Sequence, residues 1–495
     1  MFLGIDLGTS EIKLLLLGLD GRIAATAAAP LAIQRPQPLW SEQQPADWWA
    51  GLEAACAQLA KQAPDAFAAV QAIGLAGQMH GAVVLDAQGS VLRPAMLWND
   101  GRSGAECIAL EAALPTLHGI AGNLAMPGFT APKLLWLRAH EPEVFARCAT
   151  VLLPKDWLRF KLSGERVADC SDASGTLWLD VGARRWSETL LAASGMCRAQ
   201  MPELVEGSAP SGRLLADVAA RLGLRAGIPI AGGGGDNAAS AVGIGAVAAG
   251  EGFVSLGTSG VIFVTSDRFL PKPQTAVHAF CHALPGRWHQ MSVMLSAASA
   301  LRWATQLTGA ADEAALLAEA AELSDDQRAR APLFLPYLGG ERTPHNDPQA
   351  QGALVGLSHE HGRGQLAHAV VEGVSFGLLD GWLALDADLR KRVETLTLVG
   401  GGARSPYWAQ WLASTLGLPL VLRDGGETAA ALGAARLAAL AMGGNEATVC
   451  APAAVTARFD PDPALQASLQ LRHARFRALY PALHERGLRS PTNLV

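Results

Sequence analysis

The sequence predicts a mixed α/β protein made of two similar halves that face each other across a cleft. The tetrapeptide Leu-Gly-Thr-Ser occurs at Leu7 to Ser10 and again at Leu256 to Ser259, about half the chain apart. Strand-like apolar runs first follow one another and then alternate with helical stretches, a pattern typical of α/β layers. With 495 residues, the chain is also longer than one hydrophobic core usually serves. We therefore expect two domains.

The first half is expected to begin with three successive strands, because its short apolar runs are separated by tight-turn residues. A helix and a fourth strand should follow, and Gly77 and Gly81 mark the loop after that strand. The expected elements are strands over 2–6, 13–19 and 22–28, a helix over about 45–62, a strand over 70–76, and a hairpin that pairs 82–85 with 91–94.

The second half repeats this pattern after a run of four glycines, 232–235, which precedes Asp236 and a helical stretch. Residues 248–252 are the best linker candidate, so we place the domain boundary near residue 247 and expect domains of 1–247 and 248–495. A later strand over 395–399 leads through glycines 400–402 into a helix over 405–416. This order of strand, glycines and helix start indicates a turn that faces an anion or a nucleotide.

Composition and charge exclude several classes of function. A formal charge of −6 and a pI near 6.1, without a long Lys/Arg run, argue against a nucleic-acid partner. The most apolar stretches are too short or carry a charge, and Asp6 interrupts the N-terminal one, so we expect neither a membrane span nor a signal peptide. We therefore expect a cytoplasmic protein whose seven scattered cysteines are reduced. The chain has no convincing dinucleotide-binding fingerprint and no P-loop.

The two Leu-Gly-Thr-Ser segments are candidate phosphate turns. Glycine allows a tight turn between two strands, and Thr and Ser line that turn with hydroxyl groups. Two such hairpins, facing each other, would offer N–H and hydroxyl groups to one polyphosphate. Asp6 precedes the first copy, and a carboxylate beside phosphates is what a Mg²⁺-nucleotide site requires. An ordinary turn without a ligand is the alternative interpretation.

Asp236 is the strongest candidate for a catalytic residue. The glycines before it remove side chains, so that a substrate can approach the backbone. A carboxylate at this place can accept the proton of a substrate hydroxyl group as its oxygen attacks a γ-phosphorus. The alternative is that Asp236 caps a helix that starts at Asn237, since aspartate is a favoured N-cap residue.

Other residues could contact a polyol. Met79 and His80 lie in a glycine-flanked loop, where a neutral histidine can form a hydrogen bond with a sugar. Trp98 is followed by the polar residues Asn99, Asp100 and Arg102, although tryptophan is equally often used for packing.

His278, Cys281, His282 and His289 are of residue types that can bind a metal ion. His278 and His282 would share one face of a helix near Cys281 and His289. Their spacing fits no closed zinc site, so we expect no transition metal there.

Several longer motifs resemble the FGGY carbohydrate kinases, a family within the actin/hexokinase/Hsp70-like ATPase superfamily. The resemblance covers nearly the whole chain and fades after about residue 440. One departure is Ala139, which stands where the family usually has a polar or charged side chain. The motifs that carry the resemblance lie at 4–10, 38–43, 76–81, 97–102, 334–337, 339–344 and 352–372.

The resemblance implies two actin-like (ribonuclease H-like) ATPase domains, the first binding sugar and the second nucleotide. It implies ATP-dependent phosphorylation of the 5-hydroxyl group of D-xylulose, with ATP and Mg²⁺ bound. By position, it implies Asp236 as general base, Asp6 at the Mg²⁺-phosphate end, and Met79, His80 and Asn237 as sugar contacts. Carried over in the same way, one phosphate turn is formed by Gly8, Thr9, Ser10 and Lys13, the other by Gly257, Thr258 and Ser259, and the adenosine turn by Gly400, Gly401 and Ala403.

Alternatives remain open at this point. Another FGGY kinase would phosphorylate ribulose, gluconate or glycerol instead, and an actin-like or Hsp70-like ATPase would use the nucleotide for switching or assembly. The family contains homodimers, so a homodimer is one option for this chain.

Overall fold

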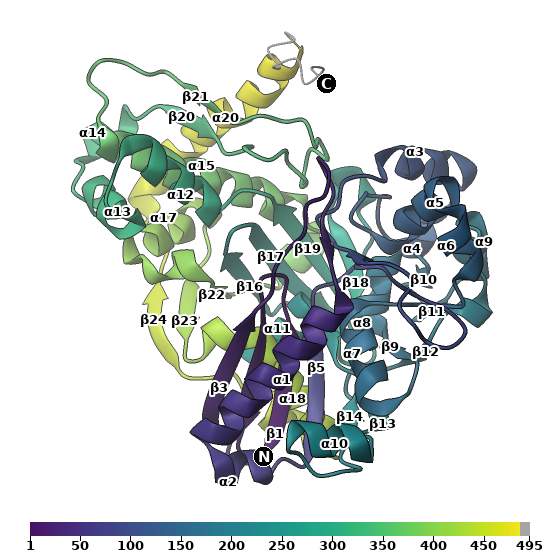
Figure 1. Cartoon of the computed structure of the whole chain (residues 1–495). Coiled ribbons are helices and arrows are strands. Elements are labelled where there is room, and N and C mark those ends of the chain that lie inside the picture. The colour runs from purple at the N-terminus through teal and green to yellow at the C-terminus, as the bar shows by residue number, and fades with distance from the viewer. Residues whose placement is uncertain (486–495) are drawn as a thin grey trace.

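The computed structural model describes residues 1–485 and contains two lobes, each built on a seven-stranded sheet (Figure 1). The first sheet contains β1 (Phe2–Leu7), β2 (Glu11–Leu17), β3 (Ile23–Pro30), β5 (Ala72–Gly77), β13 (Pro210–Arg213), β14 (Pro229–Ala231) and β15 (Gly234–Gly235). The second contains β16 (Gly252–Leu256), β17 (Gly260–Ser266), β18 (His278–Cys281), β19 (Trp288–Met294), β22 (Leu396–Val399), β23 (Leu420–Arg423) and β24 (Val455–Phe459).

The two sheets repeat one topology, which confirms the predicted duplication. In the first sheet, β1 pairs antiparallel with β2 on one side and parallel with β5 on the other, and β2 also pairs antiparallel with β3. In the second sheet, β16 pairs antiparallel with β17 on one side and parallel with β22 on the other, and β17 also pairs antiparallel with β19. The two Leu-Gly-Thr-Ser segments are the turns of the β1–β2 and β16–β17 hairpins, so they occupy equivalent places.

Helices cover the sheets, and smaller elements extend both lobes. The helices are α1 (Pro45–Gln62), α2 (Pro64–Ala68), α3 (Gly104–Ala113), α4 (Leu117–Ala121), α5 (Thr130–His140), α6 (Pro142–Arg147), α7 (Pro154–Ser163), α8 (Cys170–Ala173), α9 (Glu188–Ala193), α10 (Ala216–Leu222), α11 (Asp236–Ile244), α12 (Ala298–Thr308), α13 (Glu313–Ala321), α14 (Asp325–Ala329), α15 (Arg363–Ala384), α16 (Ala387–Lys391), α17 (Pro406–Leu416), α18 (Ala429–Ala441), α19 (Glu446–Val449) and α20 (Pro463–Glu485). The minor strands are β4 (Glu42–Gln43), β6 (Val83–Leu85), β7 (Ala95–Met96), β8 (Thr150–Leu152), β9 (Val167–Asp169), β10 (Leu179–Asp180), β11 (Arg185–Trp186), β12 (Glu203–Val205), β20 (Leu333–Leu335) and β21 (Ala353–Val355). Short 3₁₀ helices are η1 (Ser174–Thr176), η2 (Arg198–Gln200), η3 (Pro273–Thr275), η4 (Gly401–Arg404) and η5 (Gly426–Thr428).

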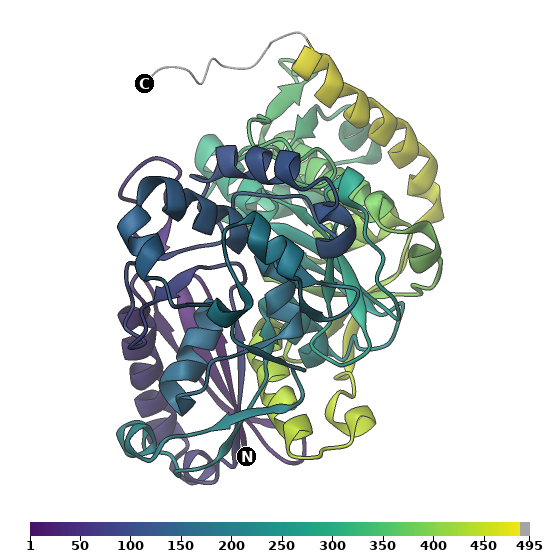
Figure 2. The same ribbon diagram turned by 90° about the vertical axis from the view of Figure 1, so that its right-hand side faces the viewer.

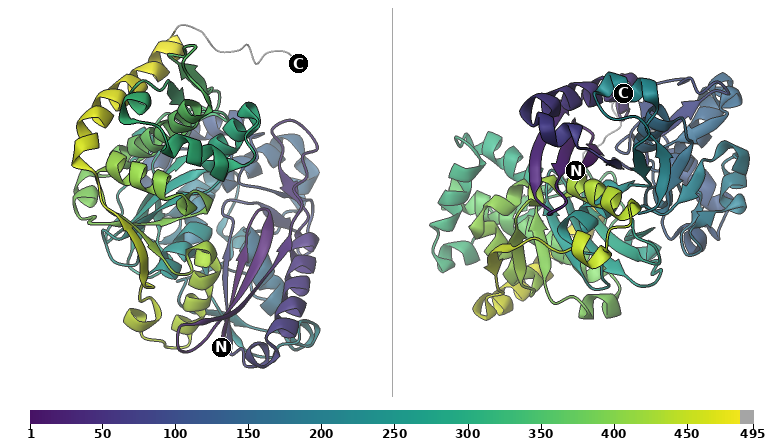
Figure 3. Two further views of the ribbon diagram at one scale, coloured as in Figure 1. Left: turned by 90° about the vertical axis from the view of Figure 1, so that its left-hand side faces the viewer. Right: turned by 90° about the horizontal axis from the view of Figure 1, so that it is seen from below.

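Helix α18 lies against the sheet of the other lobe. It packs on β1 and β5 and crosses α11, so a late segment of the chain lies beside the first strands (Figure 3, left). Small residues allow this contact, because a Cβ on Gly433 would lie 1.7 Å from the carbonyl oxygen of Ala239. In return, Ala241 and Ile244 of α11 share a core cluster with Phe253 of β16. The lobes are therefore joined through a pair of helices as well as through the chain near residue 247.

Most of the predicted elements named above are confirmed, and two predictions are wrong. Residues 91–94 form no strand, because only an isolated bridge joins Val91 to Leu85. Residues 278–281 form the buried strand β18 instead of a helix, so His278 and His282 do not share a helix face. Because this segment pairs with β19 along its length, its backbone N–H and carbonyl groups form hydrogen bonds within the sheet.

The remaining predictions concern the membrane, the cysteines and the C-terminus. Within residues 1–485, no helix is long and apolar enough to cross a membrane. All seven cysteines are free thiols, and Cys197 alone is exposed. Helix α20 runs along the outside of the second lobe (Figure 2). The predicted domain of 248–495 extends beyond the described residues, since 486–495 lie outside them.

Candidate active site

A cavity of about 400 Å³ lies between the two halves and brings several predicted site residues together. Asp6 and Lys13 come from the first hairpin, Asn237 comes from α11, and Gly400 and Gly401 follow β22. These elements meet between the lobes (Figure 1). The cavity is also lined by Ser240, Phe253, Ser255, Val399, Arg404, Gly426, Glu427, Thr428, Ala429 and Ala430.

Asp6 offers an unused acceptor to this cavity. It stands directly opposite Lys13 in the β1–β2 register, and Lys13 Nζ pairs with Glu11 Oε1 at 3.1 Å. The Oδ1 atom of Asp6 is buried and accepts no hydrogen bond. Burial, and then the charge of Asp236, raise the pKa of Asp6 to about 7. A buried carboxylate without a donor is a suitable oxygen ligand for a hard cation.

Asp236 occupies the first position of α11, with Gly235 as the N-cap residue. Its Oδ1 atom accepts hydrogen bonds from the backbone N–H of Asn237 at 2.8 Å and from Nδ2 of Asn237 at 3.0 Å. The alternative that Asp236 is the N-cap of a helix starting at Asn237 is therefore wrong, because the helix begins one residue earlier. Burial raises the pKa of Asp236 to about 6, against the effect of these two bonds.

His80 is held from two sides in a left-handed backbone conformation with φ of 68°. Its Nδ1 lies 2.7 Å from the carbonyl oxygen of Gly175. A carbonyl can only accept, so Nδ1 carries the proton and Nε2 keeps a lone pair. The carbonyl oxygen of His80 accepts hydrogen bonds from Thr130 Oγ1 and from Lys133 Nζ, each at 3.0 Å. Burial lowers the pKa of His80 to about 3, so the ring is neutral at physiological pH.

Two glycines fix the loop that carries Met79 and His80. A Cβ on Gly175 would lie 2.5 Å from Nδ1 of His80, and a Cβ on Gly235 would lie 2.8 Å from Cγ of Met79. Any side chain at either position would displace its neighbour. The loop therefore packs directly against the backbone that precedes Asp236.

The first turn is tied to Trp98 by a hydrogen-bond network. Trp98 Nε1 donates to Thr9 Oγ1 at 2.9 Å, and Thr9 Oγ1 lies 3.2 Å from Oε1 of Gln78, to which it donates. Gln43 Nε2 donates to the carbonyl oxygen of Thr9 at 2.7 Å. The Thr9 hydroxyl is thus used within the protein, whereas Gly8 is half-buried and Ser10 is exposed at the turn.

Asp100 and Arg102 form part of a buried ion-pair cluster. Arg102 Nη2 lies 2.6 Å from Asp100 Oδ2 and 2.7 Å from Glu42 Oε1, and Arg93 Nη2 lies 2.6 Å from the same Glu42 oxygen. The guanidinium of Arg102 also stacks 3.5 Å from the ring of Trp40. These bonds brace the loop, and Asn99 is its exposed polar residue.

Of the second predicted phosphate turn, 257–259, and the predicted adenosine turn, 400–403, only Gly400 and Gly401 are among the residues that line this cavity. The Thr258 carbonyl accepts from the N–H of Ala297, and Ser259 Oγ donates to the carbonyl of Leu295 at 3.3 Å, so β19 and its exit loop brace residues 257–259. The Ala403 N–H donates to the Gly400 carbonyl, and its side chain is buried in the core. Gly257 and Gly401 complete these two turns, with Gly401 exposed.

A second cavity of about 660 Å³ continues from the first, since Gly401 and Arg404 line both. Its other walls come from α12, α13 and the start of α17, with apolar residues such as Leu301, Leu317 and Pro406. A polar phosphate-sized space joined to a larger apolar one suits a nucleotide, whose base is flat and apolar.

His278, His282 and His289 form a packed aromatic cluster with Phe263 and Phe280. His289 stacks on Phe263 with 4.1 Å between ring centroids, and burial holds the pKa of His289 well below its ordinary value. In the described part of the chain, the one group of three or more His, Cys, Asp or Glu residues close enough to share an ion is Asp156, Asp169 and Asp172. Its centre is taken by the ammonium group of Lys155.

Comparison with known proteins agrees with this arrangement. The FGGY family of carbohydrate kinases matches twice, its N-terminal domain over residues 1–243 and its C-terminal domain over residues 252–442. The chain belongs to this family. Membership of the FGGY kinases implies a sugar and ATP as substrates. The two joined cavities described above are large enough for a nucleotide.

Individual FGGY kinases resemble the chain over nearly its full length. It is 51% identical over 485 residues to the xylulose kinase of Escherichia coli (strain K12), covering 98% of this chain and 99% of that protein. The solved structure of a kinase from Brucella ovis superimposes with a TM-score of 0.92 at 48% identity, covering 98% of this chain and 99% of that one. The xylulose kinase from Rhodospirillum rubrum does so with 0.89 at 31% identity, covering 99% and 100%.

Several residues that shape the site of this FGGY kinase were missed by the sequence analysis. Gly175, Ser171 and Lys155 support Asp236 or His80 from distant parts of the chain. Their signal was weak, since Lys155 and Asp156 are two adjacent charges in an otherwise apolar stretch and nothing there fits a binding motif.

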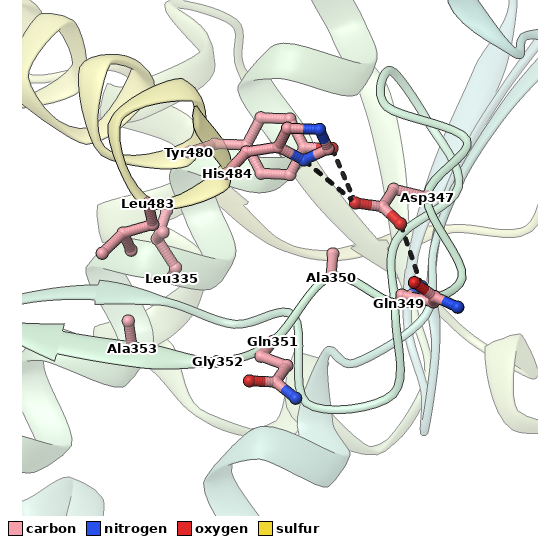
Figure 4. Close-up of a pocket in the computed structure, with 10 residues that line it drawn as sticks. All are labelled: Leu335, Asp347, Gln349, Ala350, Gln351, Gly352, Ala353, Tyr480, Leu483 and His484. Atoms are coloured by element: carbon pink, nitrogen blue, oxygen red, sulfur yellow. Dashed lines mark hydrogen bonds and ion pairs between the residues drawn. The ribbon is translucent and has the colours of Figure 1, made fainter. Parts of the chain in front are cut away.

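A separate small cavity of about 90 Å³ lies at the edge of the second lobe, between the β20–β21 region and α20 (Figure 4). Tyr480 donates a hydrogen bond to Asp347 Oδ2 at 2.9 Å, and His484 Nδ1 lies 3.6 Å from the same oxygen. This cavity shares no lining residue with the two cavities above, so we assign it no part in the kinase reaction.

Proposed function

We propose that this FGGY kinase transfers the γ-phosphoryl group of ATP to the 5-hydroxyl group of D-xylulose, with Asp236 as general base. The observation that carries the proposal is the pair of neighbours that flank Asp236: Gly235 before it packs against Met79, and Asn237 after it lines the cavity that contains Asp6. The sugar is suggested by the similarity to the E. coli protein over nearly the full chain.

In the proposed reaction, the 5-oxygen forms a bond to the γ-phosphorus while the bond from that phosphorus to the bridging oxygen of ADP breaks. The proton of the hydroxyl group passes to the carboxylate of Asp236. Since the transferring group carries its negative charge on three oxygens, most of the acceleration comes from positioning and electrostatic stabilisation. Asp236 therefore needs to be ionised and correctly placed at the moment of attack.

The residues present fit a Mg²⁺ ion beside the phosphates. The buried Oδ1 atom of Asp6 accepts no hydrogen bond, and hard oxygen atoms are the ligands that Mg²⁺ prefers. When bound, the ion would neutralise charge on the phosphate oxygens. Asp6 would hold it, directly or through water, and Lys13 would contact the phosphates from the opposite strand.

The remaining nucleotide contacts are proposed as follows. Gly8 and Ser10 of the first turn, and Gly257, Thr258 and Ser259 of the second, would offer N–H and hydroxyl groups to the phosphates. Thr9 supports the first turn through its bond with Trp98. Gly400 and Gly401 would lie against adenosine. The side chain of Ala403 is buried in the core and would anchor that turn.

At the sugar end, we propose direct contacts from one loop and one helix. Nε2 of neutral His80 would accept a hydrogen bond from a sugar hydroxyl group, because its Nδ1 is already a donor to Gly175. Met79 and Trp98 would cover apolar faces of the sugar, and Asn99 and Asn237 would add polar contacts. Asp100 and Arg102 would support this loop through their ion pairs.

The experiment that tests the proposal is an ADP-release assay across a panel of acceptors. We expect kcat/KM to be highest with D-xylulose, and the product to carry its phosphate on the 5-oxygen. Higher kcat/KM with D-ribulose, gluconate or glycerol would replace the sugar while leaving the phosphoryl-transfer mechanism in place. ATP hydrolysis at one rate with and without every acceptor would contradict the proposal entirely.

A further inference from the structure

A fully buried cluster of five charged residues lies behind the glycine run that precedes Asp236. Lys155, Asp156 and Arg159 lie on α7, Asp169 ends β9, and Asp172 lies on α8, and all five side chains are completely shielded from solvent. Lys155 Nζ is the centre of the cluster, at 2.6 Å from Asp156 Oδ1, 2.7 Å from Asp169 Oδ2 and 2.9 Å from Asp172 Oδ2.

The charges of this cluster compensate one another. Burial holds the pKa of Asp172 well above its ordinary value, although the charge of Lys155 acts in the opposite direction. Burial alone would lower the pKa of Lys155, but the neighbouring carboxylates outweigh it and keep Lys155 charged. The side chains of Lys155 and Arg159 thus lie among the carboxyl groups of Asp156, Asp169 and Asp172. Apolar residues of similar volume would often stabilise a core as well as such a cluster does, so its value is expected to lie in fixing geometry.

Two arms of the cluster reach the glycine run. Arg159 donates from Nη2 to the carbonyl oxygen of Gly232, at the start of the run. At its end, the backbone N–H of Gly235 donates to Ser171 Oγ at 3.1 Å, and the Ser171 hydroxyl donates to Asp169 Oδ1. Gly235 is the residue immediately before Asp236. The path from Lys155 to Asp236 thus runs through Asp169, Ser171 and one backbone amide.

The segment that contains Ser171 also holds the sugar-binding loop. Residues 169–176 comprise the end of β9, helix α8 and η1, and the Gly175 carbonyl in η1 accepts the Nδ1 proton of His80. Ser171, which holds Gly235, and Gly175, which holds His80, are four positions apart in the chain. The segment is itself rigid, because Asp169 caps α8 by accepting from the N–H of Ser171 and of Asp172.

We propose that residues 169–176, anchored by Lys155, form a positioning element that sets the distance between the base Asp236 and the sugar contact His80. The inference rests on the proposed function for the roles of those two residues. Ser171 holds the start of α11, and Gly175 holds the imidazole ring of His80. A change at Ser171 or at Gly175 would therefore shift Asp236 and His80 relative to each other. The sugar hydroxyl group and the base would then meet without rearrangement of either element.

The test compares Ser171→Ala with a matched control, Ser194→Ala. Both hydroxyl groups are buried, and each accepts one hydrogen bond from an N–H group and donates one. In the control, Ser194 Oγ accepts from Trp178 Nε1 at 2.7 Å and donates to the carbonyl oxygen of Leu191 at 2.9 Å. Misplaced reacting groups lose roughly 10–100-fold in rate, so we expect Ser171→Ala to lower kcat by about that factor, with KM for sugar and ATP within about threefold. Ser194→Ala should keep kcat within about twofold while losing a similar amount of thermal stability.

Two further measurements separate positioning from general damage. Gly175→Ala should raise KM for the sugar more than KM for ATP, because the new Cβ displaces His80. Amide hydrogen exchange in the peptide over 232–237 should quicken in Ser171→Ala and not in Ser194→Ala, whether or not a sugar is turned over. If Ser171→Ala does not fold, Asp169→Asn replaces it, with the same expected signature.

The outcomes are distinguishable. Equal loss of kcat in the Ser171 and Ser194 variants, or unchanged kcat and unchanged exchange in folded Ser171→Ala, overturns the positioning element. A wild-type protein that phosphorylates none of the panel sugars overturns the proposed function instead, and the exchange measurement then still decides whether Ser171 holds Gly235.

Discussion

At the scale of single residues, Asp236 and Asp6 are two buried carboxyl groups with different surroundings. Asp236 Oδ1 accepts two hydrogen bonds from Asn237, whereas Asp6 Oδ1 accepts none. A general base must be ionised and correctly placed, and a metal-binding oxygen must be free of competing donors. The environments of these two side chains therefore favour the division of roles that we propose.

Replacement of the base is the most direct prediction. Asp236→Asn keeps the shape of the side chain but removes its capacity to accept a proton, so kcat should fall by about 10²–10⁴ while the Kd for ATP changes little. Steady-state kinetics and calorimetric nucleotide binding measure the two quantities. The control is Asp217→Asn, the same change at an exposed residue in the first turn of helix α10, which should leave both values unchanged. Turnover within a few-fold of wild type in Asp236→Asn would remove Asp236 from this role.

The pH dependence of the reaction should report these carboxyl groups. Their pKa values stand at about 6 for Asp236 and about 7 for Asp6 in the free protein. Because the base acts in its ionised form, kcat/KM for the sugar should rise as the pH increases through this range and level off above it. The rising part of the profile should report both carboxyl groups, because the charge of Asp236 also raises the pKa of Asp6. A flat profile between about pH 5 and pH 8 would contradict this assignment.

The same burial predicts a stability effect at Asp6. Its pKa is 3.8 in an unperturbed carboxyl and about 7 in the folded protein, so the folded state prefers the protonated form. Wild-type stability at this site is therefore fully present below about pH 4 and is lost as the pH rises through about 7. Asp6→Asn removes that loss, so its Tm should exceed that of wild type at pH 8, and the difference should vanish near pH 4. A difference in Tm that does not vary with pH would argue against the shift.

At the scale of elements, the contact between α11 and α18 depends on glycine. A Cβ on Gly433 would lie 1.7 Å from the Ala239 carbonyl, so Gly433→Ala should push the helices apart. Overpacking of this kind costs about 1–3 kcal/mol. Since α11 begins at Asp236, kcat should fall as well. Thermal unfolding and kinetics measure both effects.

The control for this substitution is Gly119→Ala in α4, where the added Cβ would meet nothing within 4 Å. Alanine in an open helical position should stabilise by about 0.5–1 kcal/mol. If both variants unfolded at the same temperature as wild type, the close approach of the two helices would not matter for stability.

Elements defined by local pattern could be predicted from the sequence, and those defined by distant contacts could not. Apolar runs beside Gly-Thr-Ser placed both hairpins, and Pro45 and Pro406 marked two helix starts correctly. The spacing of His278 and His282 suggested a helix, but pairing with β19 overrides so weak a local signal.

The supports of the site illustrate the same limit. Ser171 contacts Gly235, which lies 64 positions away, and Gly175 contacts His80, which lies 95 positions away. No local periodicity records such pairs. The residues proposed to touch substrate stand in motifs, whereas the residues that hold them in place are recognised only in three dimensions.

At the scale of the whole molecule, the two halves should not fold separately. Leu432 and Ala435 of α18 share a core cluster with Phe2 and Leu15 of the first sheet, so residues 1–247 alone would expose that face. We expect this fragment to be insoluble or to lack a cooperative unfolding transition by circular dichroism. Attaching residues 428–442 through a flexible linker should restore the transition. Cooperative unfolding of the unmodified fragment would show that α18 is dispensable.

The crossing of α11 and α18 also has an electrostatic consequence. Both helices begin at the wall of the 400 Å³ cavity, where Asn237 and Ser240 of α11 and Ala429 and Ala430 of α18 line it. Each helix N-terminus carries about half a positive elementary charge from its aligned peptide dipoles. The formal charges of Lys13 and Arg404 in that wall are matched by those of Asp6 and Glu427. Apart from the Mg²⁺ ion proposed at Asp6, the positive potential of this wall therefore comes from the two helix N-termini, which favours the triphosphate that we propose to bind here in a chain of net charge −6.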